Sequence, residues 1–263
     1  SLEQDLKFIT PGLKAKVTFS FDKFSANSVT RSKNPDYYNP ATSRLENGEL
    51  NTSIQENGQQ FLGYSTGAEW GDQSVYLEGM LSYNRVFEQK HDVNAMFMYN
   101  QKNYDRGETL PYRSQGIAGR FSYTYDSRYI AEFNFGYNGS ENFARGKRFG
   151  FFPAVAVGWI ASQEKFMQPF SDVISNLKLR ATWGQAGNSN IEGRRFAYIS
   201  TIVDTGSYTW GTDANIYRLG RAEGDIGVPD LTWETVTKMN VGLDLGLWNN
   251  TINYTVDLFK EKR

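Results

Sequence analysis

The side chains that most often carry out enzyme chemistry are nearly absent from this sequence. Among 263 residues there is no cysteine and one histidine, His91. The chain therefore has no thiols for a disulfide or a zinc cluster, and only one imidazole that could serve a serine nucleophile as a base. Because His91 stands in the polar run 88–92 between two apolar-alternating segments, we expect it in a solvated turn. We expect no catalytic residue, metal or cofactor.

Charge and hydropathy exclude two further classes of protein. The formal net charge is -1, from 28 Lys and Arg against 29 Asp and Glu, so there is no basic surface for nucleic acid. No window approaches the roughly 20 apolar residues that a membrane helix needs, and the mean hydropathy is -0.57. A transmembrane β-barrel has an equally low average, because only every second residue of its strands faces lipid. An aromatic content of 15% suits the aromatic girdles of such a barrel.

Two-residue alternation between apolar and polar side chains recurs along the chain, which is typical of strands with two different faces. It is clearest at 117–125 and, after a short turn, at 129–137, and these two runs predict a hairpin. A further strand begins near Phe151. The other alternating runs are 13–21, 75–83, 93–99, 177–183, 239–247 and 252–258. The sequence therefore predicts about nine antiparallel strands with an apolar face and a polar face.

A soluble β-sandwich also alternates in this way, because one face of each of its sheets is wet. Two features favour the membrane barrel. The runs are about nine to twelve residues long, near the length that a tilted strand needs to cross a bilayer. Aromatic residues also gather at strand ends, as Tyr123, Tyr125 and Tyr129 do around one turn.

The connections alternate in length, which predicts an orientation, since outer-membrane barrels have short periplasmic turns and long extracellular loops. We expect 162–176 to be periplasmic, with one helical turn at 164–167. Within the long connections, we expect 61–70 and 196–210 to form loop hairpins outside the wall. The short turns are 86–90, 126–128 and 249–250, and the long connections are 22–73, 102–114, 138–150 and 185–233.

Several observations predict a segment of a larger barrel. Nine strands is an odd number, whereas bacterial single-chain barrels have an even number. The chain starts at Ser1 without a secretory signal and ends at Arg263 without the aromatic residue expected of a closing strand.

Residues 115–260 resemble the barrel of SusC/RagA-type TonB-dependent transporters. The matching pieces come in the order of that family, and residues 1–114 match more loosely through 9–13 and 81–85. The pieces are Tyr125-Asp126-Ser127-Arg128-Tyr129, 136–153, Gly158-Trp159, Glu164-Lys165-Phe166-Met167, 176–184, Gly187-Asn188, Pro229-Asp230-Leu231-Thr232-Trp233-Glu234-Thr235 and 242–250.

The resemblance implies a barrel of roughly 22 strands with a plugged lumen in the outer membrane of a Bacteroidota-like bacterium. It implies import of an oligosaccharide or a peptide, driven by TonB, together with a SusD-like surface lipoprotein. On this basis residues 1–263 are one part of the receptor barrel, with the plug domain, the segment that contacts TonB and the closing strands outside the sequence.

The resemblance and the alternation together indicate where function would lie. We expect the charges of the polar face to pair with neighbouring strands and with the plug, because a charge facing lipid is costly. We treat 140–153 as a structural loop, since no helix follows it to bind an anion. As substrate-binding candidates in an extracellular loop we single out Trp210 first, with Tyr208, Tyr198 and Arg194. The alternative is that these side chains contact the lipoprotein or pack within the loop. The polar-face charges are Lys14, Lys16, Glu78, Arg120, Glu132, Lys178, Arg180, Lys238 and Asp244.

Two other functions remain open from the sequence. An outer-membrane barrel enzyme, such as a protease or acylhydrolase, would need a nucleophile, a base and an orienting group within reach of one another. A pair of carboxylates could supply the acid and the base, since proximity across strands is invisible in one sequence. A structural or adhesive barrel would need no such groups.

Overall fold

The computed structural model describes residues 1–40, 42–108, 110–191, 193–212 and 216–263. They divide into two compact units, which we describe separately. The first unit comprises residues 1–21, 74–104 and 112–263 and holds most of the strands. The second comprises residues 22–73 and 105–111.

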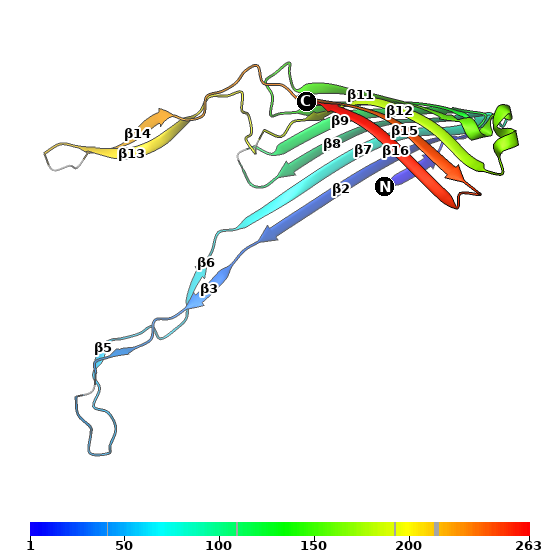
Figure 1. The fold of residues 1–263 in the computed structure, drawn as a ribbon. Helices are drawn as coiled ribbons and strands as arrows, with labels where there is room; N and C mark the ends of the chain where they lie inside the picture. Colours follow the sequence, from blue (N-terminus) through cyan, green and yellow to red (C-terminus); the bar gives the residue numbers. More distant parts are fainter. Residues whose placement is uncertain (41, 109, 192, 213–215) are drawn as a thin grey trace. The chain divides into compact units, whose positions relative to one another are not determined.

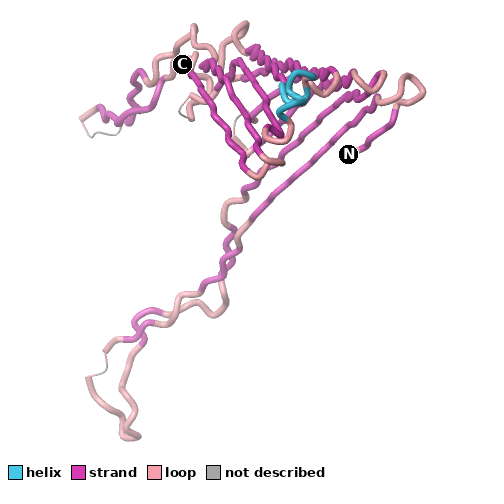
Figure 2. Tube along the Cα trace, turned by 45° about the vertical axis from the view of Figure 1, so that its right-hand side comes forward, coloured by secondary structure: helices cyan, strands magenta, loops and turns pink. Residues whose placement is uncertain are grey.

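A 10-stranded antiparallel sheet forms the wall (Figures 1 and 2). Its strands are β1 (Leu2–Asp5), β2 (Leu13–Ala26), β7 (Trp70–Phe87), β8 (His91–Asp105), β9 (Tyr112–Tyr125), β10 (Tyr129–Ser140), β11 (Phe149–Ile160), β12 (Ile174–Asn188), β15 (Glu234–Leu247) and β16 (Ile252–Lys262). Each pairs with the next in this order, so the sheet is open, with edges β1 and β16. All nine predicted strands are present. The tenth, β1, was missed because four residues are too few to show alternation.

The register confirms that one face of the sheet is apolar. A single row of paired residues crosses seven strands, from β8 to β12 and on through β15 and β16, and every member is apolar or aromatic. The row is Val93, Tyr123, Ala131, Val157, Ala181, Val241 and Leu258. We call the side of the sheet that bears this row the apolar face, and the opposite side the polar face.

The apolar face is exposed and is not packed against another layer. Val157 and Val241 are each 57% exposed and Phe121 is 48% exposed. Among the described residues only four apolar side chains are buried, namely Phe143, Phe152, Ala161 and Ala197, and none belongs to the apolar row. The second layer that would cover this face in a β-sandwich is therefore missing from the described residues, and the apolar face is left for another apolar phase.

The height of the apolar face matches a membrane. On β10 it runs from Tyr129 to Tyr137, eight steps that span about 27 Å along a strand. With the tilt of about 40° that is usual in barrels, this corresponds to a rise of about 20 Å, close to the band of about 25 Å that outer-membrane barrels present to lipid.

The short turns lie at one end of the strands. Glu88 and Gln89 have positive φ values of 48° and 57°, and Asp126 and Ser127 have values of 48° and 54°. In each three-residue turn a backbone hydrogen bond closes over these two residues, from the Lys90 N–H to the Phe87 carbonyl and from the Arg128 N–H to the Tyr125 carbonyl. Two successive positive φ values match the right-handed twist of the strands that the turn joins. These turns contain no glycine, and only their polar residues marked them in the sequence.

The prediction that His91 lies in a turn was wrong. It is the first residue of β8, because the tight turn closes before it, and it pairs with Tyr125 across the ladder. Its Nδ1 atom lies 2.7 Å from the hydroxyl oxygen of Tyr123. The imidazole is thus a member of the aromatic rim at this end of the sheet.

The predicted helical turn between β11 and β12 is confirmed. It forms two short 3-10 helices, η1 (Ala161–Gln163) and η2 (Lys165–Phe170), drawn in cyan in Figure 2. Glu164 separates them, and its backbone N–H donates to the carbonyl oxygen of Ala161. The predicted turn covered only 164–167, whereas the two helices together extend from Ala161 to Phe170.

The long connections lie at the opposite ends of the strands and contain hairpins of their own. In the first unit β13 (Ile202–Trp210) pairs with β14 (Ile216–Glu223), and in the second unit β3 (Val29–Ser32) pairs with β6 (Gly63–Thr66) and β4 (Tyr37–Tyr38) with β5 (Ile54–Glu56). The loop hairpins predicted at 61–70 and 196–210 are therefore outside the wall, except that Trp70 already begins β7. The connections predicted at 102–114 and 138–150 are shorter than expected, since the flanking strands extend into them.

Candidate functional site

Ion pairs between neighbouring strands satisfy charges on the polar face. Arg120 of β9 donates to a carboxylate oxygen of Glu132 on β10 at 2.7 Å, and the side-chain amide of Asn134 donates to the other oxygen at 2.7 Å. Each of the three side chains lies next to the others because strand pairing places residues of equal parity side by side. The predicted pairing of Arg120 and Glu132 with a neighbouring strand is confirmed.

Arg180 joins three strands. Its Nε donates to Asp244 on the adjacent β15 at 3.3 Å, and its Nη2 reaches Asp257 on β16 at 2.8 Å. Arg180 is paired with Gly242, and Gly242 with Asp257, so the guanidinium crosses over a residue that has no side chain. A cation bound by two carboxylates on different strands holds this part of the wall together.

Two more of the predicted charges form ion pairs with a neighbouring strand. Lys14 pairs with Glu3 on β1 at 3.2 Å, and Lys238 with Glu261 on β16 at 3.5 Å. Glu78 accepts a hydrogen bond from the Tyr76 hydroxyl at 2.6 Å. Lys16 lies opposite Glu3, and Lys178 lies opposite Asp244. Lys14 and Met80 line one hollow with Arg120, and Lys16 and Glu78 stand two residues from them on the same strands. All nine predicted charges are thus on the polar face.

The β13–β14 hairpin presents two of the predicted binding residues to solvent. Tyr208 and Trp210 are 62% and 63% exposed. They are two residues apart on β13, so they share one face of the hairpin, and Arg218 lies beside Tyr208 on that face. Two aromatic rings beside a guanidinium could stack on a sugar or hold a peptide side chain.

The other two predicted binding residues lie at the base of this hairpin. Arg194 forms an ion pair with Asp225 at 3.2 Å, and the Tyr198 ring stands edge-on to Phe196 at 6.3 Å. Thr201 closes the base of the hairpin by hydrogen bonds with Asp225 and Gly224. Trp210 lies nine positions further along the chain, which corresponds to about 30 Å along a strand. The structure therefore divides the four candidates into two pairs. Their role in binding stays a prediction.

An apolar cluster at the long-connection end was missed by the sequence analysis. Phe143, in the loop between β10 and β11, is fully buried. Its ring lies 5.4 Å from that of Trp233, which lies 5.1 Å from that of Phe152. The indole nitrogen of Trp233 donates to the carbonyl oxygen of Arg148 at 3.2 Å. The loop covers only 141–148 of the predicted 140–153, because β10 extends to Ser140 and β11 begins at Phe149. Trp233, within the matching piece 229–235, was the available signal for the residue that packs on this loop.

Arg195 fixes the base of the β13–β14 hairpin to the wall. It forms an ion pair with Glu141 at 2.5 Å. Its guanidinium carbon also lies 3.8 Å from the ring centre of Tyr112, the first residue of β9. Charge pairing and a cation–π contact together restrain the point from which the hairpin leaves the sheet.

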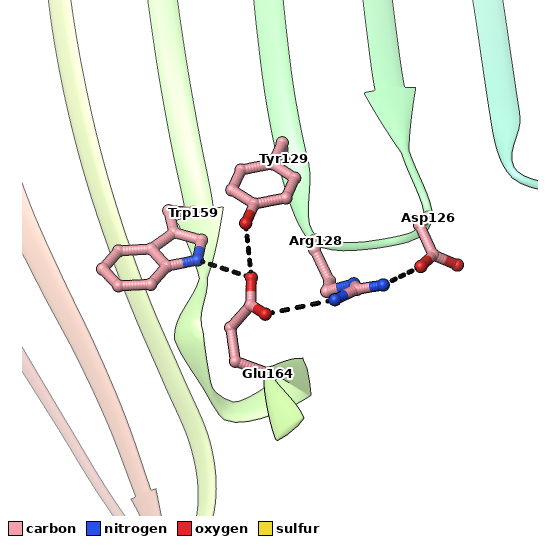
Figure 3. Close-up of polar contacts among 5 residues, drawn as sticks. All are labelled: Asp126, Arg128, Tyr129, Trp159 and Glu164. Atoms are coloured by element: carbon pink, nitrogen blue, oxygen red, sulfur yellow. Dashed lines mark hydrogen bonds and ion pairs between the residues drawn. The ribbon is translucent and has the colours of Figure 1, made fainter. Parts of the chain in front are cut away.

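At the short-turn end, Glu164 gathers three donors (Figure 3). One carboxylate oxygen accepts from the Tyr129 hydroxyl at 2.6 Å and from the Trp159 indole nitrogen at 3.3 Å. The other accepts from Arg128 at 3.1 Å, and Arg128 also donates to Asp126. The cluster joins the β9–β10 turn to the junction between η1 and η2.

This network shifts the acid–base equilibria of its members. The hydrogen bond from Tyr129, then those from Trp159 and Arg128, hold the pKa of Glu164 below its ordinary value. The hydrogen bond from Arg128 lowers the pKa of Asp126, and the hydrogen bonds to Asp126 and Glu164 raise the pKa of Arg128. All three groups are therefore charged near neutral pH.

Among the described residues, no three His, Asp or Glu side chains lie together as a metal site requires. No helix in the same part of the chain is long and apolar enough to span a membrane.

The fold matches solved transport proteins. The structure of the RagAB peptide transporter superimposes with a TM-score of 0.65 over 95% of this chain and 28% of that chain, at 20% sequence identity. The RagAB peptide importer in its "open-open" state gives a TM-score of 0.64, at the same identity and coverage of this chain. This likeness supports the same barrel architecture.

The sequence matches curated receptors as well. The TonB-dependent receptor SusC of Bacteroides thetaiotaomicron is 34% identical over 144 residues, 55% of this chain and 14% of the relative. A TonB-dependent receptor of Formosa agariphila is 26% identical over 282 residues, 95% of this chain and 24% of the relative. The chain thus spans a quarter or less of the length of these relatives. The model of the TonB dependent receptor-like β-barrel family matches residues 2–263, and the chain belongs to that family.

Proposed function

We propose that this chain forms part of the wall of an outer-membrane importer that takes up an oligosaccharide or a peptide with energy delivered through TonB. The observation that carries the proposal is the separation of the two faces. An exposed apolar face crosses the sheet from β8 to β16, and the opposite face bears the ion pairs. Such a sheet suits a boundary between lipid and a wet lumen.

The rest of the barrel would come from other segments of a longer protein. The sheet has two free edges, β1 and β16, and the chain covers 28% of the RagAB transporter chain that it resembles. In a barrel of roughly 22 strands around a plug, about half of the strands, and the plug, would come from those other segments. Residues 1–263 then act as one segment of the receptor barrel, and the polar face borders the wet lumen that holds the plug.

The partners follow from the same family. Its members are named for their dependence on TonB, and we propose a SusD-like surface lipoprotein as the partner at the long-connection end. A peptide substrate is supported by the RagAB structures, which are described as a peptide transporter, and an oligosaccharide is the other substrate that the SusC/RagA-type resemblance implies. Trp210 and Tyr208 would contact the substrate, with Tyr198 and Arg194 beside the path. The relatives from Bacteroides and Formosa support a Bacteroidota-like outer membrane.

Deletion of the full-length gene tests the proposal. The mutant should fail to grow on one class of polymer, glycan or peptide, as the limiting nutrient, and should grow normally on the corresponding monomers. The tagged full-length protein should copurify with a surface lipoprotein. Normal growth on every polymer together with purification of the protein alone would contradict the importer function and favour a structural or adhesive barrel.

A further inference from the structure

The connection between β11 and β12 exposes large apolar side chains without a covering layer. Phe166 and Phe170 of η2 are 60% and 56% exposed, and Val173 is 46% exposed. Lys165 at the start of η2 is exposed as well. A short segment that combines exposed aromatic rings with a lysine has the composition of a membrane-interface segment.

The hydrogen bonds of Glu164 hold this segment on one side of the wall. The carboxylate accepts from the Tyr129 hydroxyl and the Trp159 indole nitrogen (Figure 3). These two residues are paired with each other and belong to the apolar face. The Phe166 ring lies 6.4 Å from that of Trp159. The connection is therefore fixed to the apolar face and does not fold across the polar face.

The surface beside the connection is also suited to lipid. A shallow groove of about 510 Å³ lies on the sheet next to Trp159, and its lining includes Val157, Leu179, Ala181 and Val241. Each of these four residues belongs to the apolar face by register. The exposed rings of the connection thus continue an apolar surface that already reaches the short-turn end.

We propose that Lys165–Phe170 is a membrane-contacting segment that lies in the headgroup region of the periplasmic leaflet, with Phe166 and Phe170 against the acyl chains and Glu164 as its tether. The occupant of this surface is the phospholipid bilayer, because the segment is continuous with the face that the proposed function assigns to lipid. The inference rests on that function and adds a periplasmic connection to the lipid-contacting surface of the wall.

Spin labels on the full-length protein in phosphatidylethanolamine–phosphatidylglycerol liposomes test the inference. Residues 1–263 contain no cysteine, and any cysteine elsewhere in the protein is replaced by serine. Single cysteines are placed at Phe166, at Val155 on the apolar face, at Ala156 on the polar face and at Ser127 in the turn. Power saturation then compares accessibility to oxygen, which is enriched in lipid, with accessibility to the water-soluble complex Ni-EDDA.

The label at 166 should favour oxygen over Ni-EDDA, less strongly than the label at 155 and clearly more than the label at 127. A label at 166 that matches the label at 127 would overturn the inference while the wall stays in lipid. A label at 166 that neither reagent reaches would overturn it in favour of a protein partner. If the label at 155 is itself accessible to Ni-EDDA, the membrane placement of the whole wall fails.

Variants of the tether distinguish its role from a general effect on folding. Glu164→Ala removes the acceptor for Tyr129 and Trp159, and the label at 166 should move toward the signal of the label at 127. Glu164→Gln keeps an oxygen that can accept from both donors and should preserve the signal in lipid. An unchanged signal in Glu164→Ala, with the label at 155 still in lipid, would show that Glu164 does not tether the segment.

Discussion

Adjacent residues on one strand experience different surroundings on the two faces of the wall. Val155 lies on the apolar face between Phe133 and Trp183 and is 42% exposed. Ala156, the next residue, lies on the polar face between Glu132 and Thr182. In a water-soluble protein the exposed valine would be the more tolerant position, whereas in a barrel wall it is the less tolerant one. The face that a residue occupies, and not its exposure alone, therefore determines which substitutions are tolerated there.

Arginine substitutions at these two positions should give the largest difference. Val155→Arg places a charge near the middle of the lipid-facing band, which costs about 2–4 kcal/mol. Ala156→Arg places it opposite the Glu132 carboxylate on the wet face and should be tolerated. Folded protein in the outer membrane, measured by heat-modifiable migration on gels, should fall sharply only for Val155→Arg. Equal levels of the two variants would show that the apolar face does not meet lipid.

Removal of a cation from the polar face should have a smaller effect. Arg180→Met leaves Asp244 and Asp257 on neighbouring strands without their shared partner. The full-length protein should unfold at a lower urea concentration than the wild type, and Asp257→Asn in the same chain should recover part of that loss by removing one uncompensated charge. If the effects of Arg180→Met and Asp257→Asn on the urea midpoint simply add in the double variant, the bridge does not stabilise the wall.

Changes on the β13–β14 hairpin should leave the wall intact and affect uptake alone. Trp210→Ala removes an exposed ring that we propose contacts substrate, and uptake should fall by about 5- to 30-fold, the effect of losing 1–2 kcal/mol of contact. Thr209→Ala, on the opposite face of the same strand, is the matched control. The readout is growth on the polymer that the deletion strain cannot use. Similar growth of both variants and wild type would remove Trp210 from the substrate path.

Acid should release the η1–η2 connection, and this is the smallest of the expected effects. The pKa of Glu164 is lowered from 4.5 by its donors in the folded protein. The contribution of a carboxylate with a lowered pKa is fully present above the unfolded value and is lost as the pH falls through the folded value. A spin label at 166 should thus stay immobile near neutral pH and gain mobility only below about pH 4.5. Glu164→Gln should abolish this pH dependence, and a transition above that pH would contradict the assignment to Glu164.

The alternation predicted the wall because period-two patterning is a local property of each strand. It gave all nine longer strands and the assignment of Arg120, Glu132, Arg180 and Asp244 to one face. The missed strand, β1, carries only Leu2–Asp5, and such a short segment is specified by its pairing with β2. The strand boundaries next to the long connections were predicted less accurately, because the polar ends of strands resemble loops in composition.

The contacts between distant segments could not be predicted. Arg195 meets Glu141 and Tyr112 across 54 and 83 positions of sequence, and no local pattern encodes that encounter. Glu164 is separated from Tyr129 by 35 positions, and its tethering role depends on how the connection folds back. Trp210 and Tyr198 were grouped because they are close in sequence, whereas an extended strand places them at opposite ends of the hairpin.

The central claim is that lipid covers one face of this sheet and water the other. A spin-label scan of single cysteines at positions 238–241 of β15, in the full-length protein in liposomes, tests it most directly. Oxygen accessibility should peak at 239 and 241, and Ni-EDDA accessibility at 238 and 240, in phase with the pairing of Val241 to Ala181. Uniform Ni-EDDA accessibility along the strand, or an alternation of the opposite phase, would contradict the account.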